Sequence, residues 1–508
     1  MRNKILLSIA VFIAGLCSII YELLVSTTAT YFLGDGVRQF SIIIGVYLFS
    51  MGIGAFLSKY LSKLPIRFFV HVEFLLGFIG GISVPLLYFL FVQVSPLTLQ
   101  ILCLVIIFVI GLLTGMEVPL LTFAFDGVNV KNDLSNVLSL DYIGGLLATL
   151  IFPFILLPFV GLYYSSLIFG ILNIVLGLVI SFKFLDFSKK TFAFGITTLI
   201  GLLVLVGCGG RLLKVWDNAI YKSPIVLNEQ TPYQKIVVTK KLEDVRLYLN
   251  RVIQFSSLDE HRYHESLVHI PIGAHENPKK ILILGGGENL ASREVLKHAT
   301  VESIDVVDID STMFYLAKEH PIFKKINQNA AVHAKVNLIT ADAFSYLANT
   351  TEVYDVVIAD LPDPVNEAIA RLYSRQFFLL AKSKLSKNGV FVTQAGEIYF
   401  SNTVFSCINT TLKEVFKTTH AYHTYIPSFG DWGFVMAADH DLPLQSVPGK
   451  FPKTNKFLTA TQYGNMFNLP TDLEIVETKV NTMDSPVILN YYLDDWAKWK
   501  TDLQQGTP

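Results

Sequence analysis

Before about Gly210 the chain is a succession of apolar runs, each about long enough to cross the hydrocarbon core of a bilayer. A membrane-spanning helix needs about 20 mainly apolar residues. Runs of roughly this length lie at residues 5–27, 39–58, 68–92, 99–123, 139–160, 162–182 and 191–208. A cleaved signal peptide cannot explain runs that recur downstream, and so many of them are rare in soluble proteins. The sequence therefore predicts a membrane bundle of about seven spans over residues 1–210.

Four acidic residues interrupt or flank these apolar runs: Glu22, Glu73, Glu117 and Asp141. Carboxylates inside a bilayer are energetically costly, so the first interpretation of each is functional. The alternative is that an acid near the end of a span simply reaches the interface. Glu22 and Glu117 are the better candidates for a polar path through the bundle, and no sequence feature assigns them a substrate.

The overall composition excludes several classes of protein. Of 508 residues, 52% are hydrophobic and only 16% are charged, which excludes a disordered chain and is unusual for a soluble enzyme. The formal net charge of -1 gives no reason to expect nucleic acid as a partner. Four cysteines, three of them in apolar runs, make a disulfide framework improbable.

After Gly210 the pattern changes to short strands and helices. Residues 236–238 and 245–249 indicate a small β subdomain over residues 211–277. Apolar strands then alternate with helical segments over residues 278–452, which predicts a parallel, doubly wound α/β sheet of the Rossmann-like kind. Residues 453–508 form a polar C-terminal appendage. No metal site is expected, because no Cys/His partners stand at ligand spacing.

Three groups of polar residues could carry chemistry. After the strand 281–284, the glycine turn Gly285–Gly287 precedes Glu288, and Asp308 follows about 20 residues later. Such a turn brings backbone N–H groups close to a nucleotide, and an acid at the end of the next strand can hold ribose hydroxyls. The spacing is not GxGxxG, so an adenosyl group fits better than a dinucleotide. The structural alternative is a tight turn followed by an ordinary surface acid.

The other two groups are an acid pair and a polar cluster. Asp360 and Asp363 follow an apolar strand, where ligands of open α/β sheets bind, and carboxylates there can bind amines and accept a proton. A turn or helix-capping role is the alternative for both. The cluster contains Gln234 and the run Asp259–Glu265, which includes Tyr263 and His264. His264 alone would more often be structural than catalytic.

The order of these motifs resembles the polyamine aminopropyltransferases, the spermidine synthase family. The resemblance covers about residues 233–467. It rests on Tyr233-Gln234, Gln254, the 259–265 run, Gly285-Gly286-Gly287-Glu288, Val307-Asp308-Ile309-Asp310, Asp342-Ala343, Asp360-Leu361-Pro362-Asp363-Pro364 and Leu372-Tyr373-Ser374. The family usually has Gly-Gly-Gly-Asp-Gly where this chain has Glu288-Asn289, and a polar pair where it has Leu361-Pro362.

The resemblance implies a reaction and a role for each residue. The family transfers an aminopropyl group from decarboxylated S-adenosylmethionine, a co-substrate, to putrescine, and uses no prosthetic group. Asp360 would be the general base and would also bind the amine. The implied donor-binding residues are Gln234, Gly285, Gly287, Glu288, Asp308, Asp342 and Ala343. The implied amine-binding residues are Tyr263, His264, Asp360 and Asp363.

The resemblance also bears on location and partners. Basic residues near the apolar runs place the N-terminus in the cytoplasm, and an odd number of spans would send the C-terminal half outside. The donor is made in the cytosol, however, so we expect a multi-pass cell-membrane protein with a cytoplasmic catalytic domain, in contact with the lipid bilayer. The family is typically oligomeric, which makes a homodimer plausible.

Two other functions remain open from the sequence. One is different sulfonium chemistry on the same fold, either methyl transfer or a lyase cleavage. Glu288 argues against methyl transfer, because it would repel the carboxylate of S-adenosylmethionine. The other is a transporter or sensor that binds a nucleoside or polyamine without turnover.

Overall fold

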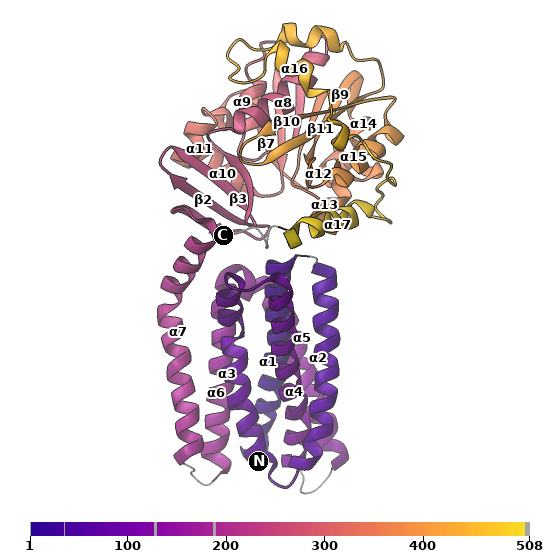
Figure 1. Ribbon diagram of the computed structural model, residues 1–508. Coiled ribbons are helices and arrows are strands. Elements are labelled where there is room, and N and C mark those ends of the chain that lie inside the picture. Colours follow the sequence, from indigo (N-terminus) through magenta and orange to yellow (C-terminus); the bar gives the residue numbers. More distant parts are fainter. Residues whose placement is uncertain (1, 35, 126–129, 186–188, 503–508) are drawn as a thin grey trace. The chain divides into compact units, whose positions relative to one another are not determined.

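The computed structural model describes residues 2–34, 36–125, 130–185 and 189–502 (Figure 1). The chain divides into two compact units, Met1–Lys222 and Ser223–Pro508. The expected bundle limit at residue 210 lies inside the last bundle helix, which continues to Tyr221. Of the expected C-terminal appendage, residues 503–508 lie outside the described residues. The finer domain limits at residues 277 and 452 stay predictions.

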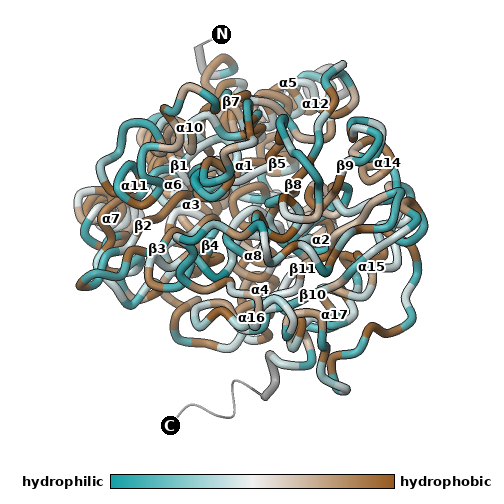
Figure 2. The backbone as a smooth tube through the Cα atoms, turned by 90° about the horizontal axis from the view of Figure 1, so that it is seen from above, coloured by the Kyte–Doolittle hydropathy of each residue, from teal (hydrophilic) through white to brown (hydrophobic). Residues whose placement is uncertain are grey.

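The first unit is a bundle of long helices. They are α1 (Arg2–Leu33), α2 (Gly36–Ser58), α3 (Pro65–Phe91), α4 (Pro96–Phe125), α5 (Val130–Ile151), α6 (Gly161–Phe184) and α7 (Lys189–Tyr221). Within the described residues, six helical stretches are long and apolar enough to cross a membrane. Seen from above and coloured by hydropathy, the tube shows both hydrophobic and hydrophilic stretches (Figure 2).

The count of six differs from the expected seven because one stretch, Leu134–Phe184, is 51 residues long. It contains α5, a π-helical segment (Phe152–Val160) and α6. At about 1.5 Å per residue it is far longer than a bilayer core is thick. At Gly161 the backbone leaves the helical region, with φ 77° and ψ 164°. Here α5 packs against α1 while α6 packs against α3.

Close helix contacts in the bundle depend on small residues. A Cβ at Gly54 of α2 would lie 2.0 Å from the Leu112 carbonyl oxygen of α4. A Cβ at Gly77 of α3 would lie 2.7 Å from the Gly170 carbonyl oxygen of α6. Such approaches are typical of helix interfaces in membranes, where small residues let backbones touch.

The second unit begins with a 4-stranded antiparallel sheet in the order β1-β2-β3-β4. Its strands are β1 (Ile225–Gln230), β2 (Lys235–Lys241), β3 (Asp244–Leu249) and β4 (Val252–Ser256). The sequence indicated β2 and β3. The edge strands β1 and β4 were not expected, because β1 is mostly exposed and β4 is short, so neither has a strong apolar pattern.

A 7-stranded sheet follows, in the order β10-β11-β9-β8-β5-β6-β7. Its strands are β5 (Lys280–Gly285), β6 (Ser303–Asp308), β7 (Val336–Thr340), β8 (Tyr354–Asp360), β9 (Leu385–Glu397), β10 (Thr418–Ile426) and β11 (Gly430–Ala438). The five strands from β5 to β9 pair in parallel and confirm the Rossmann-like expectation. The sheet is mixed rather than parallel throughout, because β10 and β11 add an antiparallel hairpin whose short turn needs no crossover helix.

Helices cover both faces of this sheet. The helices of this unit are α8 (Glu260–Ala274), α9 (Leu290–Val295), α10 (Ser311–Glu319), α11 (Pro321–Ile326), α12 (Ala343–Asn349), α13 (Glu367–Ala370), α14 (Arg375–Ser383), α15 (Asn402–Val415), α16 (Ala460–Met466) and α17 (Val487–Asp502). Along β5, Leu282 and Leu284 join one core cluster while Ile281 and Ile283 join another. A strand buried on both faces explains why β5 is apolar throughout.

The C-terminal segment packs onto the α/β core. Leu458 and Met466 join one core cluster, and Leu473 and Ile488 join the other. The buried Glu265 carboxylate of α8 accepts hydrogen bonds from the backbone N–H groups of residues 456–458. The segment expected to be a polar appendage therefore completes both layers of the domain.

Candidate active site

The carboxyl ends of four neighbouring parallel strands meet at one edge of the sheet. Gly285 at the end of β5 pairs with Asp360 at the end of β8, and Asp308 at the end of β6 pairs with Thr340 at the end of β7. Asp342 follows β7 directly and caps α12. Ligands of open α/β sheets bind outside this edge. The topology thus gathers acids that are distant in the sequence.

The three glycines of the turn lie so close to Asp360 and Asp308 that no side chain would fit there. A Cβ at Gly285 would lie 2.0 Å from the Asp360 carbonyl oxygen, and the positive φ of 85° there also favours glycine. A Cβ at Gly286 would lie 2.9 Å from Oδ2 of Asp360, and one at Gly287 would lie 2.6 Å from Oδ2 of Asp308. The turn can therefore pass directly over both strand-end carboxylates.

The turn ends with Asn289, where the related family usually has glycine. Its φ of 67° and ψ of 29° are left-handed, and asparagine tolerates this region better than most residues. The Asn289 side chain donates to the Gly287 carbonyl oxygen and accepts from the Ser292 hydroxyl. The turn geometry is therefore kept although the glycine is absent.

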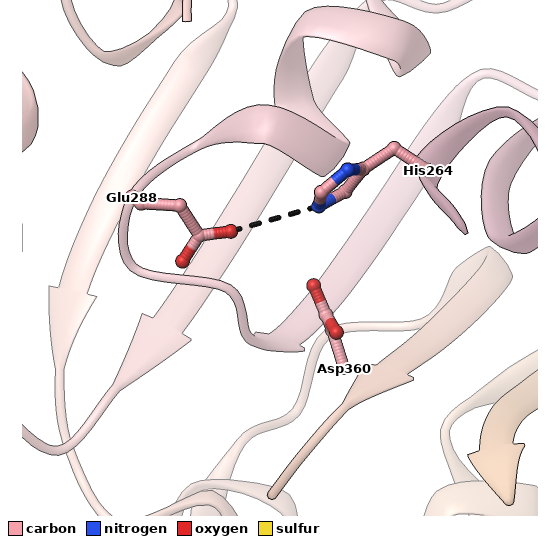
Figure 3. Close-up of side chains that lie close together, drawn as sticks. All are labelled: His264, Glu288 and Asp360. Atoms are coloured by element: carbon pink, nitrogen blue, oxygen red, sulfur yellow. Dashed lines mark ion pairs between the residues drawn. The ribbon is translucent and has the colours of Figure 1, made fainter. Parts of the chain in front are cut away.

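Two acids and a histidine lie together above this turn. One ligand atom from each of His264, Glu288 and Asp360 lies within 4.8 Å of the others (Figure 3). His264 Nε2 is 3.8 Å from Oε1 of Glu288, and the Tyr263 hydroxyl donates to Oδ1 of Asp360 at 2.6 Å. All of these side chains are buried or half-buried. The arrangement presents two carboxylates to one small space, as a cationic ligand requires.

The charge of His264 is set by a second layer of residues. Its Nδ1 lies 2.8 Å from Oε2 of Glu260. The Glu260 carboxylate also forms a bidentate ion pair with Arg293, which donates to both carboxylate oxygens. Burial opposes the charge on His264, but the carboxylates of Glu260 and Glu288 outweigh it and raise the pKa of the imidazole to about 10. A doubly protonated imidazole has no lone pair for a metal ion. The three residues therefore fit an organic cation better than a metal.

Asp360 at the end of β8 and Asp363 in the loop after it are both half-buried acids. Burial, and then the charge of Glu288, raise the pKa of Asp360 above its usual range. Burial raises the pKa of Asp363 to about 6. Gln394 of β9 donates to the Leu361 carbonyl oxygen at 2.6 Å and approaches Oδ1 of Asp363 at 3.4 Å. Asp363 is therefore held beside the edge rather than turned to solvent.

The remaining expected donor residues lie along the same edge. Asp308 accepts from the backbone N–H groups of Gly287 and Asp310, and burial raises its pKa to about 6. The Gln234 amide donates to Oδ2 of Asp310 at 3.0 Å. Asp342 accepts from Ser345 and pairs with Arg371, and Ala343 begins α12 beside it.

Sequence reasoning missed the residues that support this site. Arg293 lies 33 positions from Glu260, and no local pattern predicts that pair. Gln394 lies within β9, which continues to Glu397, and carries no motif of its own. Tyr373, noted only as part of a motif, donates to the carbonyl oxygens of Leu361 and Pro362 and holds the loop between the two aspartates.

Comparison with known proteins agrees with this geometry. The Spermine/spermidine synthase domain family matches residues 260–446. A polyamine aminopropyltransferase of Leptospira interrogans is 40% identical over 495 residues, covering 97% of this chain and 99% of that protein. One of Oceanobacillus iheyensis is 35% identical over 497 residues, covering 96% of each. Such identity along the whole length includes the helical bundle.

The chain belongs to the polyamine aminopropyltransferase family. The resemblance seen in the sequence is thereby confirmed, and the protein is an enzyme of that class. Family members use decarboxylated S-adenosylmethionine as co-substrate and need no prosthetic group.

Two solved structures are each similar to about half of the chain. A spermidine synthase in complex with the transition state analogue AdoDATO has a TM-score of 0.46 at 23% identity, covering 54% of this chain and 88% of that one. The spermidine synthase from Thermotoga maritima has a TM-score of 0.45 at 24% identity, covering 50% and 88%.

Proposed function

We propose that this aminopropyltransferase uses putrescine as its acceptor, with Asp360 as general base. The neutral amine nitrogen attacks the carbon next to the sulfonium and forms a C–N bond. The C–S bond breaks, its electron pair returns to sulfur, and methylthioadenosine leaves. The proton lost by the amine passes to Asp360, so the step needs no metal, oxidant or reductant.

The observation that carries the proposal is the placement of Asp360 and Glu288 on either side of one small space beside the glycine turn. Glu288 would bind the ammonium tail of the donor, and Asp360 would hold and deprotonate the attacking amine. The hydrogen bond from Tyr263 fixes the Asp360 carboxylate in one orientation. Correct positioning of the two reactants supplies much of the rate of such a displacement.

The other residues of the edge complete the two binding sites. Asp308 would hold the ribose and Asp342 the adenine, with Ala343, Gly285 and Gly287 lining the donor. Gln234 would act on the donor site indirectly. It would hold Asp310, which caps α10 close to Asp308 in the sequence. Asp363 would bind the distal ammonium of the amine, and His264 would balance the negative charge of the two acids that it faces.

Purified protein incubated with each donor, with and without putrescine, tests this function. We expect methylthioadenosine only from the decarboxylated donor together with the amine. Methylthioadenosine formed without any amine would show a lyase, methylthioadenosine formed from S-adenosylmethionine and the amine would show transfer of the carboxylated chain, and S-adenosylhomocysteine would show methyl transfer; each of these results would contradict the proposal. Binding of donor and amine with no product would point to a sensor.

The pH dependence of the reaction follows from the buried aspartates. As the pH falls through about 6, Asp363 takes up a proton and loses its hold on the amine, and Asp360, whose pKa is also raised, can no longer act as a base. We therefore expect kcat/KM for putrescine to fall on the acid side with a slope between one and two on logarithmic axes. Initial rates from pH 5 to 8 measure this, and a flat profile would argue against both assignments.

We further propose that the bundle spans the cell membrane and that the catalytic unit faces the cytoplasm. Six long apolar helices support the first part, and the cytosolic origin of the donor supports the second. Cys407 is buried and cannot report sidedness. Leu242 is 88% exposed, so Leu242→Cys in a Cys208→Ser background provides a reporter. A membrane-impermeant maleimide should label it only after lysis; labelling of intact cells would place this unit outside.

The family resemblance also suggests a homodimer in the membrane. The mass of the protein in lipid nanodiscs, measured by light scattering, distinguishes one copy from two.

A further inference from the structure

The interior of the bundle contains two fully buried acids that the transfer reaction does not use. Glu73 of α3 is 0% exposed and Glu117 of α4 is 2% exposed. Their carboxyl groups lie close enough to interact with each other. Among the described residues of the bundle, no lysine, arginine or histidine is buried. No basic side chain therefore neutralises the pair, and an unpaired buried carboxylate is strongly unfavourable.

Polar groups from two further helices reach the same region. The ring of Tyr21 from α1 lies against Gly80 of α3, where a Cβ would come within 2.4 Å of it. The Tyr21 hydroxyl interacts electrostatically with both Glu73 and Glu117. Gly80 thus makes room for a tyrosine that brings its oxygen to the acid pair.

The fourth helix is α6, which packs against the same face of α3. A Cβ at Gly177 would lie 3.2 Å from the Cβ of Glu73, and a Cβ at Gly77 would touch Ile174. Asn173, one helical turn before Gly177, lies on this contact face and is 0% exposed. Helices α1, α3, α4 and α6 therefore each contribute a buried polar side chain to this part of the bundle, which also contains the buried Tyr47 and Thr114.

Apart from the contact between the two carboxyl groups, these side chains lack hydrogen-bond partners among the described residues. The unpartnered atoms are the Tyr21 hydroxyl, both carboxyl oxygens of Glu73, Oε1 of Glu117, and both Oδ1 and Nδ2 of Asn173. Buried polar groups in proteins are almost always hydrogen-bonded, so a cluster of this kind implies a missing partner. Most of the unpartnered atoms are oxygens of two acids and of their neighbours, and a cation that donates hydrogen bonds would satisfy them.

We propose that Glu73 and Glu117 bind the ammonium group of an amine inside the bundle, with Tyr21 and Asn173 as further ligands. An ammonium group has three N–H donors and matches two carboxylates and one neutral oxygen. The apolar side chains around the acids, such as Phe74 and Ile174, suit the methylene chain of an amine. The choice of a polyamine among ammonium ions rests on the proposed function, whereas the ammonium chemistry does not.

Binding of radiolabelled putrescine to the full chain in lipid nanodiscs tests the site. The background is Asp360→Asn with Asp363→Asn, which weakens binding at the catalytic edge. We expect residual binding that methylammonium displaces far better than Na⁺ does. Adding Glu73→Gln and Glu117→Gln should weaken this binding at least about tenfold, because hydrogen bonds to two charged groups are lost. Glu243→Gln, at an exposed position, removes one carboxylate elsewhere and should leave binding unchanged.

Several results would overturn the proposal. They are unchanged binding in the variant without the acid pair, equal displacement by Na⁺, and no residual binding in the starting background. If the double substitution does not give monodisperse protein, Glu117→Gln alone is measured instead, and unchanged putrescine binding in that variant would overturn the proposal. Failure of the proposed function is a separate result: wild-type protein would then give no methylthioadenosine, while binding that depends on Glu73 and Glu117 would persist.

Discussion

Replacing Asp360 with asparagine is expected to lower kcat about a thousandfold while the protein stays folded. A positioned general base contributes about 10²- to 10⁴-fold to a rate, and asparagine cannot take up the proton of the attacking amine. The amide oxygen can still accept the hydrogen bond from Tyr263. The local geometry should therefore survive, and the loss should fall on the chemical step. Single-turnover formation of methylthioadenosine measures that step directly.

The matched control is Asp355→Asn, near the start of the same strand. Asp355 accepts hydrogen bonds from the backbone N–H groups of Lys279 and Lys280 and from the Ser386 hydroxyl, and is remote from the glycine turn in sequence and along β8. This variant should keep kcat within about twofold of the wild type, because Asp355 contacts none of the reacting groups and the loss of its hydrogen bonds should fall on stability instead. If Asp360→Asn also kept kcat within a factor of ten, another group would have to be the base.

The second large effect is expected at Glu288, on the choice of donor. Glu288→Gln should lower kcat/KM for decarboxylated S-adenosylmethionine by about 10- to 100-fold, because a hydrogen bond between charged groups contributes about 1.5–3 kcal/mol. The same change removes the repulsion toward the carboxylate of S-adenosylmethionine. The ratio of the two affinities should therefore shift toward the carboxylated donor. Competition between the two donors, followed by isothermal calorimetry, measures this ratio.

Glu288→Asp separates charge from shape at this position. Aspartate is the acid that the family usually has here, one methylene shorter, so it should keep the preference for the decarboxylated donor. Glu319→Gln, at the exposed end of α10, removes a charge remote from the turn in sequence and should leave the ratio unchanged. A loss of preference in Glu288→Asp equal to that in Glu288→Gln would show that length rather than charge discriminates.

The sequence predicted the elements that have strong local signals. The apolar runs, the strand before Gly285 and the acids after β6 and β8 all have patterns that follow from burial and turn chemistry. The antiparallel hairpin of β10 and β11 was missed because its strands alternate irregularly between polar and aromatic residues. Packing against β9 decides their state, and packing routinely overrides local preference.

The sequence predicted those residues of the candidate site that belong to recognisable motifs. The motifs indicated Tyr263, His264, Glu288, Asp308 and Asp360, because each lies beside a recognisable strand end, turn or polar run. No motif predicted that Arg293 would hold Glu260 in place, which in turn keeps His264 charged. Contacts between residues 33 positions apart depend on how helices pack. The packing of helices cannot be derived from local patterns in a single sequence.

By itself, the sequence determined that the chain has an apolar helical half and an α/β half with aminopropyltransferase motifs. Hydrophobicity and motif order suffice for this, because both are local properties of the chain. Only the tertiary structure decided which side chains meet: Glu288 with His264 at the sheet edge, and Glu73 with Glu117 inside the bundle. The physical reason is that a carboxylate acquires its function from its neighbours and its burial, and both are set by the packing of distant segments.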